Sequence, residues 1–258
     1  MAPSAKYIYC IIPCQEERTF DTAAIGDPHG VVHTVVYDGL AVVASDSPIA
    51  NYECTRKNMM AHEKVLERVM QEYTLLPVRF GTVADTASPV ENIHRLLRGR
   101  CQEFTQILKD MTGKAELGLK AFWRDEKALF EDIVAENPEI KRLRQRLAGK
   151  PPEVVRFEGV SLGRMVKEAL DRKRGQEAAK LLAPLRPLAE RVRENDTLAD
   201  RMILNASFLV DMSRGVEFDQ AVNRLDDEYG NRIGFKYVGP TPPYNFVDIT
   251  VNWEDFKE

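Results

Sequence analysis

The region between residues 202 and 253 shows the clearest alternation of hydrophobic and polar side chains in the chain. Residues 203–210 alternate with a period of two, which is typical of a half-buried β-strand. Residues 218–229 carry apolar side chains three and four positions apart, which predicts an amphipathic helix ending at Gly230 in a left-handed cap. Residues 233–237 alternate again. The order strand, helix, strand predicts a sheet that helices cover on one face.

The end of this region predicts an extended tail and one last strand. Gly239–Phe246 (GPTPPYNF) contains three prolines, and proline favours extended backbone at itself and at the residue before it. Val247, Ile249, Val251 and Trp253 then alternate with polar residues. We expect this strand either to dock on the protein's own body, which is the simpler interpretation, or to meet another molecule.

In the first half of the chain, the apolar pattern predicts strands at Lys6–Ile12, Val31–Tyr37, Leu40–Ser45 and Leu76–Val83. The dipeptide Asp38-Gly39 between the second and third of these supplies the positive φ angles of a type I′ hairpin turn. Helices are predicted at about residues 51–73 and from Ser88, as an N-cap, to Gly113. A domain boundary is expected near Gly113.

The second half begins with an alternating segment, Leu117–Trp123, and then becomes mostly helical as far as about Leu182. Ser161 is a plausible N-cap within this helical stretch. A weaker strand pattern follows at Leu188–Glu194. Strand, helices, strand, strand, helix, strand is the order of a ferredoxin-like domain with an enlarged first helical crossover.

Together these patterns predict an α+β protein with two domains. The N-terminal mixed α/β sheet domain covers residues 1–114, and a modified ferredoxin-like domain covers residues 115–238. The helical insertion of the second domain spans about residues 124–195, and residues 239–258 form an extended C-terminal tail. A chain of 258 residues, of which 44% are apolar and 29% charged, suits such an arrangement.

The charge is unevenly distributed. Residues 139–195 hold 15 Lys and Arg against 8 Asp and Glu, a balance of +7, while the rest holds 21 against 32, a balance of −11. Because acids are interleaved with the basic residues and aromatic side chains are scarce there, we expect exposed helices with many salt bridges and no nucleic-acid partner.

Two further patterns bear on where the protein works. No run of eighteen apolar residues occurs, and the start lacks the apolar core of a signal peptide, so we expect an intracellular protein without a membrane span. The four cysteines are then expected to be reduced thiols; they are Cys10, Cys14, Cys54 and Cys101.

The search for catalytic chemistry finds one motif. Residues 159–163 (GVSLG) match G-x-S-x-G, but the histidine base of that fold family follows the serine. Here all four histidines precede Ser161; they are His29, His33, His62 and His94. Their spacing predicts no metal site, and no phosphate-binding glycine loop is present. His62 lies on the apolar stripe of its helix, which favours a buried core histidine, and Arg79 is expected to be a salt-bridged structural residue.

Several separate segments resemble the gas vesicle protein F/L family, above all its cyanobacterial members. In chain order they are Tyr7–Ile11 (YIYCI), Tyr37–Asp46 (YDGLAVVASD), Leu76–Val83 (LPVRFGTV), Glu116–Trp123 (ELGLKAFW), Arg201–Asp211 (RMILNASFLVD) and Phe218–Ile249. The segments occur in the family's order over nearly the whole chain, and His62 matches as well. Residues 137–193 match least distinctly.

This resemblance implies a non-enzymatic accessory or minor structural protein of gas vesicles, the gas-filled protein shells inside cells that provide buoyancy. It implies contacts with the small hydrophobic shell protein (GvpA-like) and with other accessory proteins, and it brings no catalytic residue, cofactor or metal. It also implies two α+β domains, the second modified ferredoxin-like. No lipid membrane partner is expected.

A handler of a hydrophobic shell protein needs an exposed strand edge or an apolar groove. The tail offers candidate partner-binding residues, which are Pro242, Pro243, Tyr244, Phe246, Val247, Ile249 and Trp253. The N-terminal sheet around the Asp38-Gly39 hairpin is the other candidate surface. An alternative function, a ferredoxin-like enzyme that binds a small molecule or a regulatory binding domain, remains open at this point.

Overall fold

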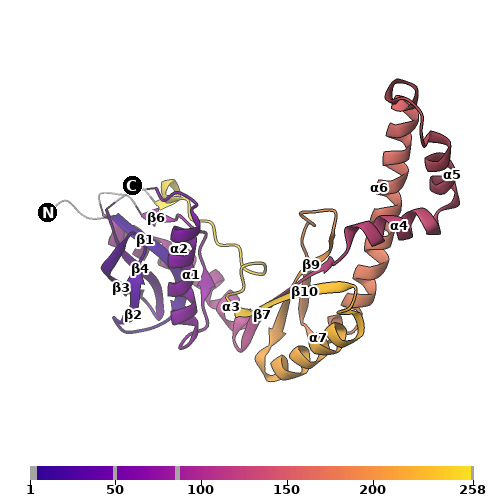
Figure 1. Ribbon diagram of the computed structural model, residues 1–258. Coiled ribbons are helices and arrows are strands. Elements are labelled where there is room, and N and C mark those ends of the chain that lie inside the picture. Colours follow the sequence, from indigo (N-terminus) through magenta and orange to yellow (C-terminus); the bar gives the residue numbers. More distant parts are fainter. Residues whose placement is uncertain (1–4, 49–50, 85–87, 257–258) are drawn as a thin grey trace. The chain divides into compact units, whose positions relative to one another are not determined.

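The computed structural model describes residues 5–48, 51–84 and 88–256 (Figure 1). The chain divides into two compact units. The first comprises residues up to Glu116 together with those from Pro240 onward, and the second comprises Leu117–Gly239. The predicted boundary after residue 114 differs from this division by two residues, while the predicted separate tail groups with the first unit.

The first unit contains an antiparallel sheet whose strands lie in the order β2-β3-β4-β1-β5, with β6 also paired to β1. Its strands are β1 (Ala5–Pro13), β2 (Thr19–Ala24), β3 (Asp27–Tyr37), β4 (Leu40–Ser47), β5 (Leu76–Pro77) and β6 (Val83–Ala84). Asp38 and Gly39 have φ angles of 46° and 81° between β3 and β4, which confirms the predicted hairpin turn.

Helices cover both faces of this sheet. They are α1 (Arg56–Met70), α2 (Pro89–Gly99) and α3 (Cys101–Met111). The buried side chains of α1 pack with Tyr7, Tyr9 and Val43 in one core. Ile8 and Val42 alternate with these strand residues and are also buried, and α2 and α3 contact the strands on that side.

Two predictions in the first unit are wrong. Leu76–Val83 is not one strand, because Gly81, with a φ of 83°, turns the backbone between β5 and β6. The helix predicted from Ser88 to Gly113 is two helices, since Arg100 leaves helical geometry at φ −119° and ψ 19°. In addition, strand β2 was not predicted.

The second unit contains a sheet in the order β10-β7-β9-β8. Its elements are β7 (Lys114–Trp123), α4 (Glu126–Glu136), α5 (Pro138–Leu147), α6 (Pro152–Leu182), β8 (Arg191–Glu194), β9 (Met202–Asp211), α7 (Gly215–Tyr229) and β10 (Ile233–Thr241). Short 3-10 helices occur at Arg186–Leu188 and Met212–Arg214. The core consists of apolar side chains from alternate strand positions, α6 and α7, and α5 with the start of α6 extends beyond the sheet (Figure 1).

Two local predictions in the second unit are wrong. Ser161 is not an N-cap, because it lies inside α6. Gly230 follows α7 with a φ of −61°, so no left-handed cap forms. The glycine is needed for space instead, since a Cβ at Gly230 would lie 2.3 Å from the carbonyl oxygen of Asp226.

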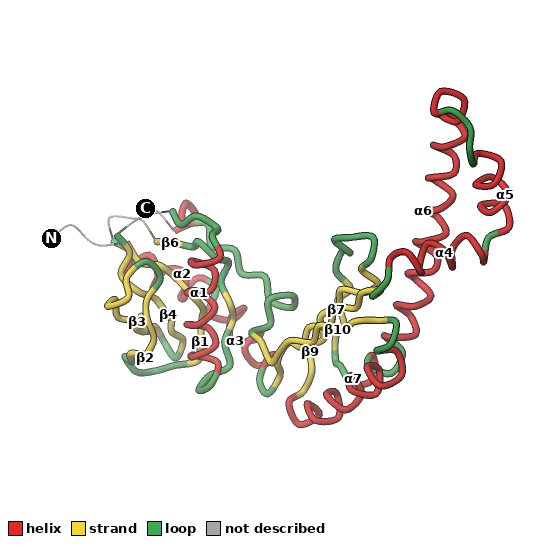
Figure 2. Tube along the Cα trace, in the orientation of Figure 1, coloured by secondary structure: helices red, strands yellow, loops and turns green. Residues whose placement is uncertain are grey.

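The C-terminal tail also differs from its prediction. Residues 247–253 form no regular strand; Ile249 makes one isolated parallel bridge to Val78, and a 3-10 helix follows at Trp253–Phe256 (Figure 2). The neighbouring strand β5 has only two residues, so it offers too little edge for a longer ladder. The alternation of buried and exposed side chains persists without the strand.

Candidate interaction site

The tail lies on the first unit, and its path is fixed from the end of β10 onward. The hydroxyl of Thr241 donates to the carbonyl oxygen of Glu116 at 3.2 Å. Pro242 and Pro243 are buried. The backbone then turns, because the amides of Phe246 and Val247 both donate to the carbonyl oxygen of Pro243. The turn directs the following residues along the edge of the first sheet.

Two branched apolar side chains anchor this segment. Val247 is 6% exposed and Ile249 is 1% exposed. Ile249 bridges Val78, which follows β5, and β5 in turn pairs with β1. The tail therefore adds to the β5 edge of the sheet as an irregular outer segment.

Asp248, between these two anchors, points outward and binds Arg79. Nε and Nη2 of Arg79 each donate to a carboxylate oxygen of Asp248 at 3.0 Å. The side chains are 64% and 69% exposed, so water screens the pair despite its two-point geometry. The salt bridge expected of Arg79 is thus present, and its structural role stays a prediction.

Two carboxylates of the first unit hold the turn. Glu116, only 5% exposed, accepts from the backbone amide of Asn245 at 2.7 Å and from its side-chain amide at 2.5 Å. The hydroxyl of Tyr244 donates to Glu63 at 2.5 Å. Burial raises the pKa of Glu63, and burial together with the Glu63 carboxylate raises the pKa of Tyr244. Further along, Arg100 donates to the carbonyl oxygen of Thr250 at 3.0 Å.

The seven residues predicted to bind a partner therefore fall into two groups. The prolines and Val247 and Ile249 are buried in the first unit, while Phe246 and Trp253 are partly exposed and Tyr244 is 37% exposed. Sequence reasoning missed their partners Glu63, Glu116 and Arg100. No local sequence signal marks these, because each lies more than a hundred residues from the tail residue that it binds.

Behind this surface the core of the first unit holds a polar and aromatic cluster. His62 is 4% exposed, and its Nδ1 lies 2.9 Å from the hydroxyl of Tyr7, which also accepts from the amide of Gly81 at 3.0 Å. The ring of Tyr9 stacks on His62. Burial lowers the pKa of His62 to about 4, so the imidazole is neutral at pH 7. The prediction of a core histidine is confirmed.

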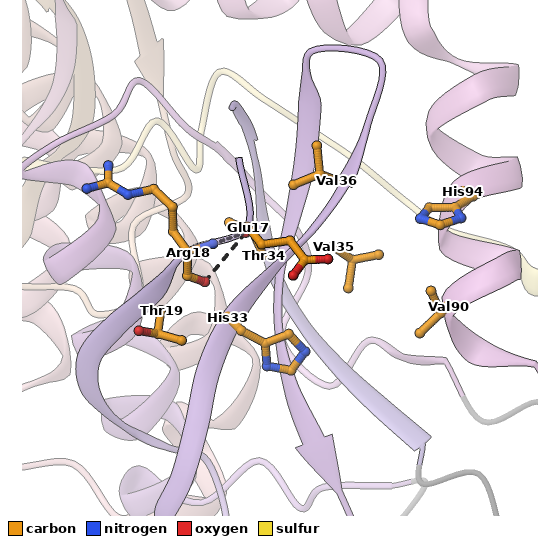
Figure 3. Close-up of a pocket in the computed structure, with 9 residues that line it drawn as sticks. All are labelled: Glu17, Arg18, Thr19, His33, Thr34, Val35, Val36, Val90 and His94. Carbon is orange, nitrogen blue, oxygen red and sulfur yellow. Dashed lines mark hydrogen bonds between the residues drawn. The ribbon is translucent and has the colours of Figure 1, made fainter. Parts of the chain in front are cut away.

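A groove of about 570 Å³ lies on the first sheet, beside the start of α2 (Figure 3). His33 on β3 and His94 on α2 line it from separate elements, with Glu17, Val35 and Val90 between them. His33 is held within its own sheet, since its Nε2 lies 3.3 Å from Lys6 and its Nδ1 lies 3.2 Å from the carbonyl oxygen of Val31.

The described side chains that line the groove do not form a catalytic or metal-binding set. Arg18 belongs to its wall, but the side chain points away from the other labelled residues and binds the hydroxyl of Tyr73 (Figure 3). Among residues 5–48, 51–84 and 88–256, no three His, Cys, Asp or Glu side chains lie together so that they could hold a metal ion. Ser161 lies within a helix, which is not the strand-to-helix turn that a nucleophile elbow needs.

Comparison with known proteins gives a consistent match. The family described as gas vesicle synthesis protein GvpL/GvpF matches residues 5–248. Gas vesicle protein F of Nostoc sp. strain PCC 7120 is 28% identical over 249 residues, which cover 96% of this chain and 99% of that protein.

Two solved structures are similar as well. The crystal structure of GvpF from Anabaena sp. PCC7120 superimposes with a TM-score of 0.81 at 28% identity, over 96% of this chain and all of that one. GvpF from Microcystis aeruginosa gives 0.77 at 27% identity, over 94% and 98% of the two chains. The mixed α/β fold is thus that of these proteins. Within the described residues, none of the helices has the length and hydropathy needed to span a membrane.

Proposed function

The chain belongs to the gas vesicle synthesis protein GvpL/GvpF family, and we propose that it is a non-enzymatic accessory or minor structural protein needed to assemble the gas-filled shell. The observation that carries this proposal is the extent of the family match. It runs from β1 through both units to Asp248 in the tail, so it includes the Arg79–Asp248 pair as well as both cores.

A role without catalysis agrees with how the titratable groups are used. His62 is neutral and buried behind Tyr7, and His33 and His94 line the groove from separate elements. Glu63 and Glu116 bind the tail. We therefore assign no catalytic, cofactor-binding or metal-binding residue.

The proposed partners are the hydrophobic, GvpA-like shell protein and other accessory proteins of the gas vesicle, which is also the proposed location. The tail surface supports this proposal, because Tyr244, Phe246 and Trp253 leave aromatic surface accessible beside the sheet edge. We propose neither a nucleic-acid nor a lipid partner.

For the second unit we propose a modified ferredoxin-like domain, residues 115–238, with helices α4 to α6 as an insertion within about residues 124–195. The strand order β10-β7-β9-β8 supports this proposal. If β7, β8, β9 and β10 are counted as strands 1 to 4, the order is 4-1-3-2, with helices after the first and third strands.

The test is binding of the purified full chain to purified shell protein and to isolated intact gas vesicles, measured by co-sedimentation. The double variant Phe246→Ala/Trp253→Ala removes accessible aromatic surface from the tail and is expected to weaken binding. Leu198→Ala is the matched control, since Leu198 is 77% exposed and lies in the second unit. A truncation after Gly239 is less informative because it also removes the buried anchors Val247 and Ile249.

If the full chain bound neither the shell protein nor vesicles, the proposed function would be wrong. If the double variant bound as well as Leu198→Ala, the tail aromatics would be excluded as the contact, and the surface around the Asp38-Gly39 hairpin would be examined next.

A further inference from the structure

The sheet of the second unit has one face that points into the core and one that does not. Successive side chains of a strand point to opposite faces of a sheet. The core takes up Leu117, Leu119, Ala121 and Trp123 of β7, Ala206, Phe208 and Val210 of β9, and Ile233, Phe235 and Tyr237 of β10. The side chains between these positions therefore form the opposite face, termed the outer sheet face. It consists of Gly118, Lys120 and Phe122 of β7, Arg191 and Arg193 of β8, Asn205, Ser207 and Leu209 of β9, and Gly234, Lys236 and Val238 of β10.

The pairing of β8 with β9 agrees with this assignment. Arg191 lies opposite Leu209 and Arg193 lies opposite Ser207, while Val192 between the two arginines packs against the core. Ser207 and Leu209 are 5% and 1% exposed, whereas both arginines are exposed. The accessible surface of the outer sheet face therefore belongs mainly to the longer side chains on the strands beside β9.

The outer sheet face is basic. Lys120, Arg191, Arg193 and Lys236 belong to it, and none of its positions carries a carboxylate. Lys236 is exposed and Lys120 is partly exposed. Among the described residues, no carboxylate forms an ion pair with either lysine. A surface with positive charges that are not neutralised attracts an anionic partner.

Two arginines next to the strand ends extend over the same face. The guanidinium carbon of Arg124 lies 3.6 Å from the position that a Cβ at Gly234 would take, and its Nε donates to the carbonyl oxygen of Gly230 at 2.7 Å. The guanidinium of Arg201 lies over the ring of Phe122, 5.5 Å from its centre. Neither contact supplies a carboxylate, so both positive charges add to the face.

The carboxylates at the strand ends on this side have other partners. Glu116 on β7 accepts two hydrogen bonds from Asn245. Asp211, the last residue of β9, accepts from the backbone amide and the hydroxyl of Ser213. These two acids therefore belong to local contacts, and the middle of the face keeps its positive charge.

We propose that the outer sheet face of the second unit binds an acidic, amphipathic segment of a partner protein. Charge complementarity argues for carboxylates on that segment, and Phe122 together with Val238, which is 46% exposed, supplies apolar contact area. A nucleic acid fits less well, because Phe122 is the one aromatic ring of the face and a guanidinium already lies over it. This inference goes beyond the proposed function, since it assigns a surface to the second unit, whereas the tail lies on the first.

The test uses a fluorescent helical peptide with leucine on one face and glutamate on the other, and it measures binding to the full chain by fluorescence anisotropy. We expect binding that weakens as the salt concentration rises. Lys120→Gln/Lys236→Gln should bind the peptide about fivefold more weakly than the unchanged protein, because two ion pairs with the peptide are lost. Lys141→Gln/Lys150→Gln is the matched control. It removes the same charge at two exposed positions of the helical insertion and should bind like the unchanged protein.

A second variant tests the other edge of the face. Arg191→Gln/Arg193→Gln changes β8 and should weaken binding by a similar factor. It also serves in place of the lysine variant if Lys120→Gln, on a central strand, disturbs folding. A peptide with glutamine in place of glutamate should lose most of the binding. If a peptide with serine in place of leucine bound as tightly as the original, the apolar part of the proposal would be wrong.

The proposal is overturned if the unchanged protein does not bind the acidic peptide, or if both face variants, with unchanged urea midpoints, bind it equally well. A loss confined to Lys141→Gln/Lys150→Gln would move the site to the helical insertion and overturn it as well. Tighter binding of single-stranded RNA of the same charge would contradict a protein partner. A dimer that dissociates in Lys120→Gln/Lys236→Gln would identify a second copy as the occupant and contradict a separate partner. None of these results depends on binding to shell protein, so failure here and failure of the proposed function are distinguishable.

Discussion

Each of the two units has its own core, and the two cores differ in character. In the first, buried hydroxyl groups and an imidazole lie among the apolar residues: Tyr7 binds His62, and Tyr9 binds Ser45 at 3.0 Å and accepts from the amide of Ile25. In the second, the buried apolar cluster includes the rings of Phe208 and Phe218, 5.0 Å apart, and the buried polar side chains Glu177 and Ser207 lie apart from it, where Glu177 pairs with Lys180 and Arg232.

This difference predicts different responses to change. A polar core specifies one arrangement, because each buried donor and acceptor needs its partner, and it becomes sensitive to pH when one of them titrates. An apolar core responds mainly to lost volume. The tail is part of the first unit and continues its use of polar contacts out to the surface.

The largest expected effect is in the apolar core. Phe218 is fully buried against Phe208 and Tyr237. Phe218→Ala should therefore lower the free energy of unfolding of the second unit by about 3–5 kcal/mol. Urea unfolding followed by the fluorescence of Trp123, in a Trp253→Phe background, measures this unit, because Trp123 is buried there. Val216→Ala on the same helix, where the side chain is 69% exposed, should change the free energy of unfolding little. Similar losses for both variants would contradict an apolar core centred on Phe218.

The next largest effect is expected in the pH dependence of the stability of the first unit. Burial lowers the pKa of His62 from 6.5 to about 4, so the unfolded chain binds more protons than the folded one between these values. The neutral, buried imidazole of His62 therefore contributes about 3 kcal/mol to the free energy of unfolding. This contribution is fully present above pH 6.5 and is lost as the pH falls through about 4. Urea unfolding monitored by Trp253 in a Trp123→Phe background, at a series of pH values, measures it. In His62→Gln this part of the pH dependence should disappear, and an unchanged slope would contradict the assignment to His62.

A smaller loss of stability is expected for Tyr7→Phe. This change removes the hydroxyl that bonds to His62 and accepts from the amide of Gly81, and it leaves the buried imidazole and the partly buried amide without this partner. The free energy of unfolding of the first unit should fall by about 1–3 kcal/mol. Tyr37→Phe provides a matched control at a partly exposed position on β3. If both variants unfolded at the same urea concentration as the unchanged protein, the polar core would be contributing no stability.

Whether an element of the fold could be predicted from the sequence depends on how far apart in the chain its interacting residues lie. The Asp38-Gly39 turn is local, so its hairpin was found. The same holds for the strong periodicity of β9 and α7. Strand β2 depends on pairing with β3, and its own sequence (TFDTAA) has no clear alternation. Ser161 was predicted to be an N-cap, yet α6 continues through it and through Gly159 and Gly163, because the cost of about 1 kcal/mol for each glycine is outweighed by the rest of a 31-residue helix.

The candidate site shows the same limit. The alternation of Val247, Ile249 and their neighbours predicted that the tail would dock or bind, and burial of these two residues agrees with docking on the protein's own body. The residues that receive the tail could not be inferred, since Arg79 and Glu63 are 169 and 181 positions away from their partners. Only the folded first unit brings them to the β5 edge.

The smallest expected effect is at the outermost polar contact of the first unit. Asp248→Ala removes the ion pair with Arg79, and both side chains are mostly exposed, so the free energy of unfolding should fall by at most about 1 kcal/mol. Ile249→Ala, one position along the same tail, removes a side chain that is 1% exposed and should cost several times more. Urea unfolding monitored by Trp253 in a Trp123→Phe background compares the two. If Asp248→Ala cost as much as Ile249→Ala, the exposed ion pair would be a main anchor of the tail, and the expectation that water screens it would be wrong.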